Sequence, residues 1–273
     1  MQSGVLTCPV CRAPLVREGH TLVCGHAHSY DLAREGYVNL LRTQKGGTHG
    51  DSREMLLSRR DFLDGGHYAF LADAACRLLA SRLSRGACVL DAGCGEGYYL
   101  SRLAAALRAA VGEVHLFGID ISREALRLAM RRVPQMTGAV ASLYEMPIAD
   151  GALDAILCLF APLSREEYCR TLKRGGLFCM AVPEARHLYG MKAVLYDTPY
   201  ENEVADSALE GFRLLAEEQL FRTVCLQTRE EIAALFAMTP YFHRTNAVGR
   251  ERLAACDTLT TELAFRLFLY ERI

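Results

Sequence analysis

Three cysteines and a histidine near the start of the chain have the spacing of a metal site. Cys8 and Cys11 form one close pair, and Cys24 and His28 form a second pair after a gap of twelve residues. Two such pairs, placed on two turns and separated by a short hairpin, surround zinc with sulfur and nitrogen donors. Because four ligands leave no open position and about 25 residues cannot build a core of their own, we predict one structural zinc ion.

Two other histidines compete for the place of the fourth ligand. His26 is the closer alternative to His28, and His20 is a more distant one. We favour His28 because the two ligands of a close pair usually have two to four residues between them. Unrelated reduced thiols and imidazoles in a loop are the alternative for the whole cluster, and the paired spacing argues against it.

A glycine-rich turn between a predicted strand and a predicted helix indicates a second binding site. Residues 89–98 (VLDAGCGEGY) have glycines, among them Gly93 and Gly95, where the chain must turn tightly and a ligand can touch the backbone. The NAD fingerprint G-x-G-x-x-G does not fit, because the third glycine comes one residue early, at Gly97. We therefore expect a nucleotide-like ligand that is not a dinucleotide.

The charges around this turn favour S-adenosylmethionine. Asp91 and Glu96 would repel a pyrophosphate, whereas the sulfonium and the amino group of S-adenosylmethionine are positive. Asp120 ends the next predicted strand about 20 residues later, where a carboxylate can accept protons from both ribose hydroxyls. The alternative is a turn that only packs a helix and an aspartate that only caps the next one, before Ser122. The two features together at this distance favour the cofactor.

Two further predicted strand ends belong to the same edge of the sheet. Ala141 and Ser142 end the third strand, where the adenine ring is expected, so Ser142 joins the predicted cofactor residues. Phe160-Ala161-Pro162 closes a fourth strand, and ligands of such sheets bind at the carboxyl ends of the strands. For Phe160, a core aromatic and a side chain that stacks on a base are equally good interpretations.

The elements that position these residues follow from the alternation of β-rich and helical stretches. This alternation predicts a doubly wound parallel sheet. Two helices with a break before His67 and Tyr68 are expected to precede the sheet, and residues 42–52 are expected to form a loop or linker. The predicted strands are 87–92, 114–119, 139–141, 153–160, 177–182, 212–226 and 262–270, and the predicted helices follow Gly97, start at Ser122 and cover 165–172.

Composition narrows the class of protein. The chain has 273 residues, a net charge of −1 and 51% hydrophobic residues, enough for one large α/β domain with a small module attached. Eight of its eleven cysteines are scattered singly, as reduced core thiols are in the cytoplasm. The longest apolar run, 155–163, is far shorter than the roughly 20 residues that a bilayer needs. We expect a cytoplasmic protein with no membrane span and no export signal.

A local excess of basic residues is the one charge signal for a nucleic-acid partner. Residues 34–60 hold six basic and three acidic side chains, which could follow a phosphate backbone. An ordinary solvated linker and helix face explain the count equally well.

Together these residues resemble the RlmA family, bacterial methyltransferases that modify guanine N1 in 23S ribosomal RNA. The resemblance covers nearly the whole chain. It implies a class I S-adenosylmethionine-dependent methyltransferase, an α/β fold that is Rossmann-like, with a mostly parallel seven-stranded sheet and an N-terminal zinc-binding module. Besides the cysteine cluster, the segments that carry it are 35–40 (EGYVNL), 59–68 (RRDFLDGGHY), 93–99 (GCGEGYY), 161–162 (AP), 186–188 (RHL) and 238–240 (MTP).

The same resemblance implies roles for residues that their own pattern would not single out. Cys8, Cys11, Cys24 and His28 correspond to zinc ligands, and the positions that hold S-adenosylmethionine correspond to Tyr68, Gly95, Glu96 and His187. It also implies a hairpin of 23S ribosomal RNA as substrate and a homodimer. The expected division is 1–40 for the zinc-binding, RNA-recognition module, 41–84 for a linker and helices, and 85–273 for the methyltransferase domain.

The predicted reaction transfers a methyl group from S-adenosylmethionine to guanine N1, which must first leave its base pair. The sequence identifies no general base; Asp91, His67 and His187 are candidates by location only. A small-molecule methyltransferase is one alternative, although it needs no zinc module. A zinc RNA-binding protein without catalysis is another, and an NAD oxidoreductase is disfavoured by the glycine spacing.

Overall fold

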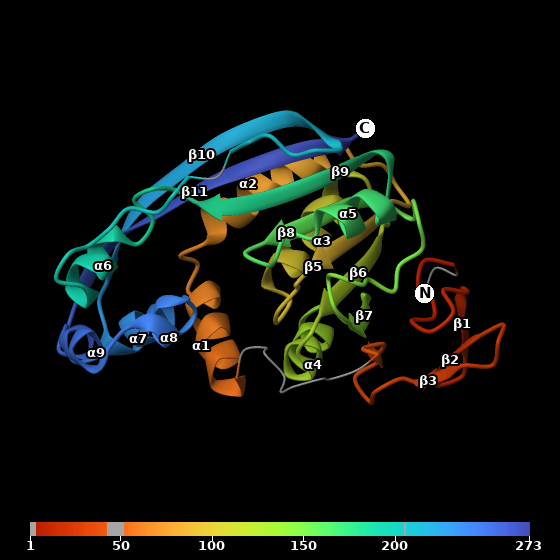
Figure 1. Ribbon diagram of the computed structural model, residues 1–273, viewed down its shortest axis with the longest axis horizontal. Helices are drawn as coiled ribbons and strands as arrows, with labels where there is room; N and C mark the ends of the chain where they lie inside the picture. Colours follow the sequence, from red (N-terminus) through yellow and green to blue (C-terminus); the bar gives the residue numbers. More distant parts are fainter. Residues whose placement is uncertain (1–3, 43–51, 205) are drawn as a thin grey trace.

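The computed structural model describes residues 4–42, 52–204 and 206–273. A small N-terminal module lies at one end of a large sheet, and a group of helices lies toward the other end (Figure 1). The described residues form two sheets, an antiparallel one in the order β1-β2-β3 and an eight-stranded one in the order β10-β11-β9-β8-β5-β6-β7-β4. No helix in these ranges is long and apolar enough to cross a membrane.

The N-terminal module is built on the predicted hairpin. Strands β1 (Leu15–Glu18) and β2 (Thr21–Cys24) pair in antiparallel register, with Leu15 opposite Cys24. A third short strand, β3 (Ser29–Asp31), pairs with β2. The hairpin therefore brings Cys24 back toward the loop that carries Cys8 and Cys11.

The large sheet confirms the predicted doubly wound fold. Its centre is parallel, and β10 and β11 add to β9 in antiparallel orientation. The strands are β5 (Cys88–Ala92), β6 (His115–Asp120), β7 (Thr137–Val140), β8 (Leu153–Leu159), β9 (Leu172–Pro183), β10 (Phe212–Leu226) and β11 (Leu259–Arg272).

The sheet has one strand more than the seven expected. The eighth strand, β4 (Val38–Asn39), belongs to the N-terminal module and pairs in parallel with β7. Two residues are too few to show the alternation of apolar and polar side chains by which a strand is predicted. The sequence therefore gives no sign of this strand.

Helices cover both faces of the sheet. On one face the core includes side chains of α2 (Ala69–Ala80), α3 (Tyr98–Ala110) and α4 (Arg123–Arg132), and on the other face it includes α5 (Arg165–Thr171) and the N-terminal module. Ser122 accepts a hydrogen bond from the Ala125 amide and so caps α4, at the residue where the sequence predicted the helix to start.

The remaining helices gather beside the carboxyl end of the parallel strands (Figure 1). They are α1 (Arg53–Asp64), α6 (Tyr189–Leu195), α7 (Arg229–Ala237), α8 (Tyr241–Arg244) and α9 (Ala247–Ala254). Helix α1 packs on α7, and Gly65 and Gly66 separate α1 from α2, which confirms the predicted break. The loop expected over 42–52 lies mostly outside the described residues.

Backbone hydrogen bonds join the N-terminal module to the segment that follows β7. The Thr7 amide donates to the Pro147 carbonyl at 2.9 Å, and the Ala149 amide donates to the Val5 carbonyl at 2.9 Å. The Arg12 guanidinium donates to the Met146 carbonyl at 3.0 Å. Because the module also shares a hydrophobic core with the sheet, its position relative to the sheet is fixed by packing as well as by β4.

Candidate cofactor cavity and metal centre

The four predicted zinc ligands lie together in the N-terminal module. The side-chain donors of Cys8, Cys11, Cys24 and His28 all lie within 4.8 Å of one another. The Cys11 and Cys24 sulfurs are 3.7 Å apart, and His28 Nδ1 lies 3.4 Å and 3.5 Å from the sulfurs of Cys24 and Cys8. A tetrahedral zinc ion would set about 3.8 Å between two sulfurs and about 3.6 Å between sulfur and nitrogen. The cluster therefore has the donor types and the size that zinc needs.

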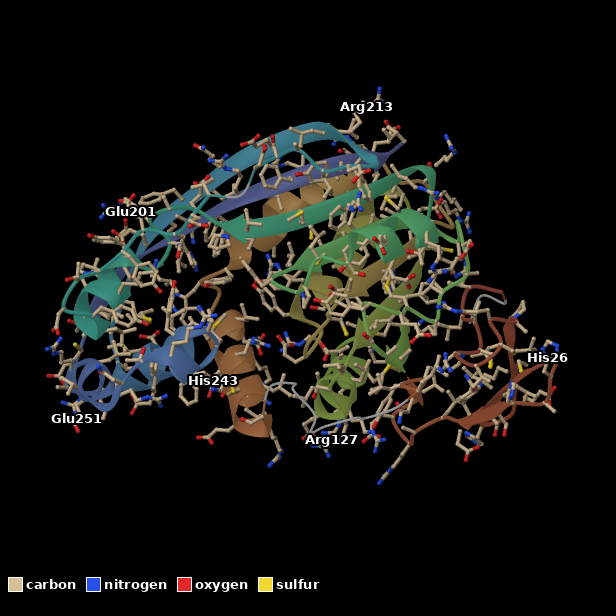
Figure 2. The ribbon with its side chains drawn as sticks, viewed as in Figure 1. His26, Arg127, Glu201, Arg213, His243 and Glu251 are labelled. Carbon is tan, nitrogen blue, oxygen red and sulfur yellow. The ribbon has the colours of Figure 1, made fainter. Side chains whose placement is uncertain are left out.

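The surroundings of Cys8 suit a metal thiolate. Burial raises the pKa of this thiol, but hydrogen bonds from the Tyr30 hydroxyl, at 3.1 Å, and from the amides of Cys11 and Val10 lower it to about 6. The competing residue His26 is exposed at the outer rim of the module and is not part of the cluster (Figure 2). His20 is exposed and also lies outside it.

A cavity of about 450 Å³ opens where the glycine-rich turn meets the ends of β8 and β9. Of the predicted cofactor residues, Tyr68, Gly93, Gly95, Glu96 and His187 line it. The rest of its lining comes from α1, from the start of α3, from the strand ends and from the segment before α8, and includes Arg59, Tyr98, Tyr99, Phe160, Ala161, Leu188, Met238, Thr239, Pro240 and Tyr241.

Glycine is required at two places in the turn. Gly93 has φ +78°, and a Cβ added to it would lie 2.4 Å from the Ala161 Cβ. Gly97 has φ +87°, and its added Cβ would lie 3.1 Å from the Cα of Ala129 in α4. The turn therefore packs directly on both the end of β8 and helix α4.

Glu96 is a buried carboxylate on the cavity wall. Arg132 at the end of α4 forms an ion pair with it, with Nε 3.1 Å from Oε2, and also donates two hydrogen bonds to Asp64. Burial raises the pKa of Glu96 to about 7 despite the lowering effect of Arg132. The ionised side chain is therefore under-compensated, and a cationic ligand in the cavity would stabilise it.

Asp91 lies behind the turn and does not line the cavity. It is buried, and its Oδ2 has no hydrogen-bond partner. Burial, together with the nearby carboxylates of Asp120 and Glu96, raises its pKa to about 8. Three acidic side chains thus lie near one another at the glycine-rich turn, an arrangement that favours positive over negative ligands.

Asp120 ends β6 and Ser142 lies two residues beyond the end of the neighbouring strand β7, and both lie outside the cavity lining. Asp120 Oδ2 accepts the Gly95 amide at 2.9 Å and Oδ1 accepts the Ser122 amide at 2.8 Å. Ser142 Oγ accepts the Tyr144 amide at 3.2 Å. Asp120 therefore ties the glycine-rich turn to the end of β6 and to the start of α4.

His187 lines the cavity as a neutral ring. Its Nδ1 accepts the Ala264 amide at 3.2 Å, and burial, with a smaller effect of Lys192, lowers its pKa to about 3. The proton of the neutral ring is then on Nε2, which is a donor. Tyr68 is buried beside it, and both rings pack against Phe265.

None of the three candidate general bases is placed as a base in the cavity. His187 is a donor, Asp91 lies behind the turn, and His67 lies in a second cavity between α1 and α7, with Nε2 3.6 Å from Glu231. Sequence reasoning did not single out Arg59, Tyr99 or Tyr241, which also line the first cavity. The available signal for each tyrosine was its adjacency to a segment already singled out: Tyr99 adjoins the turn, and Tyr241 follows residues 238–240.

Two family models match this chain, one in the N-terminal module and one in the large sheet. Residues 6–47 match the family model described as the RlmA N-terminal zinc ribbon, and residues 89–176 match a model described as a methyltransferase domain. Among solved structures, the [4+2]-cyclase SpnF is similar over 73% of this chain and 81% of its own, with 19% identity and a TM-score of 0.48.

Two curated relatives match over most of their length. A protein of Micromonospora griseorubida, provisionally named a 23S rRNA guanine-N1 methyltransferase, is 34% identical over 98% of this chain and 97% of its own. The 23S rRNA (guanine(748)-N(1))-methyltransferase of Streptomyces fradiae is 33% identical over 86% of this chain and 84% of its own. With its zinc-ribbon module and its methyltransferase domain, the chain belongs to the RlmA family of 23S rRNA guanine-N1 methyltransferases.

Proposed function

We propose that this enzyme transfers a methyl group from S-adenosylmethionine to N1 of one specific guanine in a hairpin of 23S ribosomal RNA. The observation that carries the proposal is the cavity at the carboxyl edge of the sheet, where the acidic, glycine-rich turn faces the ends of β8 and β9. The relative from Streptomyces fradiae, named for guanine N1 of the same RNA, supports the choice of substrate.

The residues around the turn fit the methyl donor. Glu96 lines the cavity and is buried with too little positive charge around it, so a positive group of the donor would stabilise its ionised form. Asp91, behind the turn, adds to the acidic character of this edge. We assign Asp120 to the ribose and Ser142 to the adenine side because they lie at and just after the ends of the two strands that follow the turn. Gly93, Gly95, Tyr68 and His187, which line the cavity, complete the predicted set.

The chemistry then depends on alignment more than on proton transfer. S-adenosylmethionine supplies a methyl group that its sulfonium has already activated. The chain's task is to hold guanine N1 in line with the bond that breaks, since orientation alone contributes several orders of magnitude to a rate. Neutral His187 can donate from Nε2 to an acceptor in the cavity, so it is not the group that takes the N1 proton.

The N-terminal module is assigned to the RNA. We keep residues 1–40 as the zinc-binding, RNA-recognition unit, 41–84 as the linker and helices, and 85–273 as the methyltransferase domain. The module is held at the β7 edge of the sheet, so an RNA bound to it would reach the domain in a fixed orientation. A homodimer and a cytoplasmic location complete the proposal, and light scattering of the purified enzyme tests the former.

The proposal is tested by incubating the enzyme with methyl-labelled S-adenosylmethionine and 23S ribosomal RNA that lacks the modification. Primer extension stops at N1-methylated guanine, so a single new stop within a hairpin is the expected result. Label that reaches only small molecules would favour the small-molecule methyltransferase. Cofactor binding without any transfer would favour a zinc RNA-binding protein.

A further inference from the structure

Phe160 has a backbone conformation that its side chain disfavours. It follows β8 with φ +64°, in the left-handed region where a bulky residue is crowded. Glycine or asparagine would adopt this conformation at less cost. Such residues are concentrated at functional sites, where the surrounding structure holds them in place.

A need to fill the core does not explain why position 160 is a phenylalanine. Phe160 is 47% exposed although it lines the cavity. Its ring neighbours are Phe265 at 5.3 Å, Tyr68 at 6.1 Å and Tyr99 at 6.4 Å between centroids, and all three are tilted by 55–59°. These rings support Phe160 from the protein side, but none lies parallel on its face. A flat ligand could therefore stack on the exposed part of the Phe160 ring.

The position of Phe160 relative to the methyl donor is set by the next residue. Ala161 is packed so closely on Gly93 that even a Cβ at position 93 would lie 2.4 Å from the Ala161 Cβ. Phe160 therefore borders the glycine-rich turn directly. A planar group lying on its ring would have its edge next to the place assigned to the donor.

We propose that Phe160 stacks on the guanine that receives the methyl group and holds its N1 edge toward the donor. This inference rests on the proposed function, because it needs an RNA base in the cavity. A base that has left its helix is commonly held by stacking on an aromatic side chain. Phe160 takes no part in proton transfer and acts by fixing the plane of the base.

The test compares four substitutions at this position. Phe160→Ala and Phe160→Leu remove the flat face, and we expect kcat/KM for unmodified 23S ribosomal RNA to fall about 10- to 100-fold, the range that base–aromatic stacking supports. Phe160→Tyr keeps the face and retains activity within about threefold. Phe160→Asn suits the left-handed backbone, so we expect a Tm equal to or above that of the wild type together with the same loss of kcat/KM.

The matched control is Phe221→Ala on β10, which removes a phenylalanine that is 65% exposed and lies outside the cavity lining. It should leave kcat/KM unchanged. Calorimetric binding of S-adenosylmethionine should be the same in all variants, because the stacking contact concerns the RNA only. Equal kcat/KM in the wild type, Phe160→Ala and Phe160→Leu would overturn the inference while leaving the proposed function standing.

A second readout follows the base itself. A hairpin transcript carries 2-aminopurine in place of the guanine that primer extension identifies. Its fluorescence should be lower in the wild-type complex than in the Phe160→Leu complex, since stacking on the aromatic ring quenches it. Equal fluorescence in the two complexes, with RNA bound in both, contradicts the inference. If the wild type methylates no ribosomal RNA, the proposed function itself has failed.

Discussion

The Arg132 guanidinium lies 3.1 Å from the Glu96 carboxylate and thereby joins the last turn of α4 to the glycine-rich turn. Glu96 is only 2% exposed, yet its pKa is about 7, so this one ion pair does not compensate for its burial. The ionised form of Glu96 is therefore destabilised in the folded protein and is available to a cationic ligand. This relationship makes cofactor affinity and stability depend on pH in opposite directions.

For Glu96→Gln we expect weaker cofactor binding without loss of stability. The raised pKa means that the folded state binds the Glu96 proton more tightly than the unfolded state does. Its contribution to stability is therefore lost as pH rises from about 4.5 to about 7. At pH 8 the variant should have a Tm equal to the wild type or about 2–4 °C higher, and a Kd for S-adenosylmethionine at least about tenfold higher.

Calorimetry between pH 6 and pH 8 separates these effects. Wild-type affinity for S-adenosylmethionine should increase over this range as Glu96 ionises, and that of Glu96→Gln should change less. Glu113→Gln is the control, because Glu113 is an exposed partner of Arg85. The same pH dependence in Glu96→Gln and in the wild type would contradict the assignment.

Gly93→Ala should destabilise the protein by roughly 2–4 kcal/mol, because a left-handed backbone and a steric overlap with Ala161 both oppose the new methyl group. Gly86→Ala is the matched control: its φ is +82°, but nothing lies within 4 Å of the added Cβ. It should cost only about 1–2 kcal/mol. Urea unfolding measures both values, and equal costs would show that Gly93 and Ala161 are not in tight contact.

Cys11→Ser should remove the zinc ion and lower the Tm. Elemental analysis should find one zinc ion per wild-type chain and almost none in the variant. The module shares a core with the sheet, so we expect a Tm decrease of several degrees with S-adenosylmethionine binding largely kept and RNA binding lost. The control is Cys225→Ser, which alters an exposed cysteine outside the cluster and should keep the metal. If metal-free Cys11→Ser binds RNA with full affinity, the N-terminal module does not have the proposed role in RNA recognition.

His187→Gln should lower the rate of methyl transfer only slightly, because neutral His187 is a donor and does not act as the base. Because the pKa of His187 is lowered to about 3, its contribution to stability is present above pH 6.5 and is lost as pH falls toward 3. Single-turnover rates at pH 8 should fall less than about tenfold in the variant. A loss of 100-fold or more, with cofactor binding intact, would identify His187 as a base after all.

The fold was predictable from local patterns because each of its main elements is marked in the sequence. Ser122 was expected to start a helix and caps α4, and the apolar run at 114–119 lies over β6 (His115–Asp120). Strand β4 was not predictable, since its two residues pair only because the N-terminal module packs on the edge of the sheet. The glycine-rich turn was found because its glycines and acidic residues are adjacent in the chain.

The rest of the cavity depends on contacts between distant segments. The ion pair of Arg132 with Glu96 needs α4 to end beside the turn, and the neutral state of His187 needs the amide of Ala264. The left-handed conformation of Phe160 accompanies the contact of the next residue with Gly93. Each of these depends on tertiary packing, for which a single sequence carries no local sign.

The pairing of β4 with β7 also affects how the protein behaves towards other copies of itself. Unpaired edge strands offer free amides and carbonyls to which another chain can add a strand, and this is a common start of aggregation. Strand β4 and the segments around the metal ligands cover one such edge. Chelation of the metal should therefore make concentrated solutions of this enzyme self-associate, through the edge that the N-terminal module normally covers.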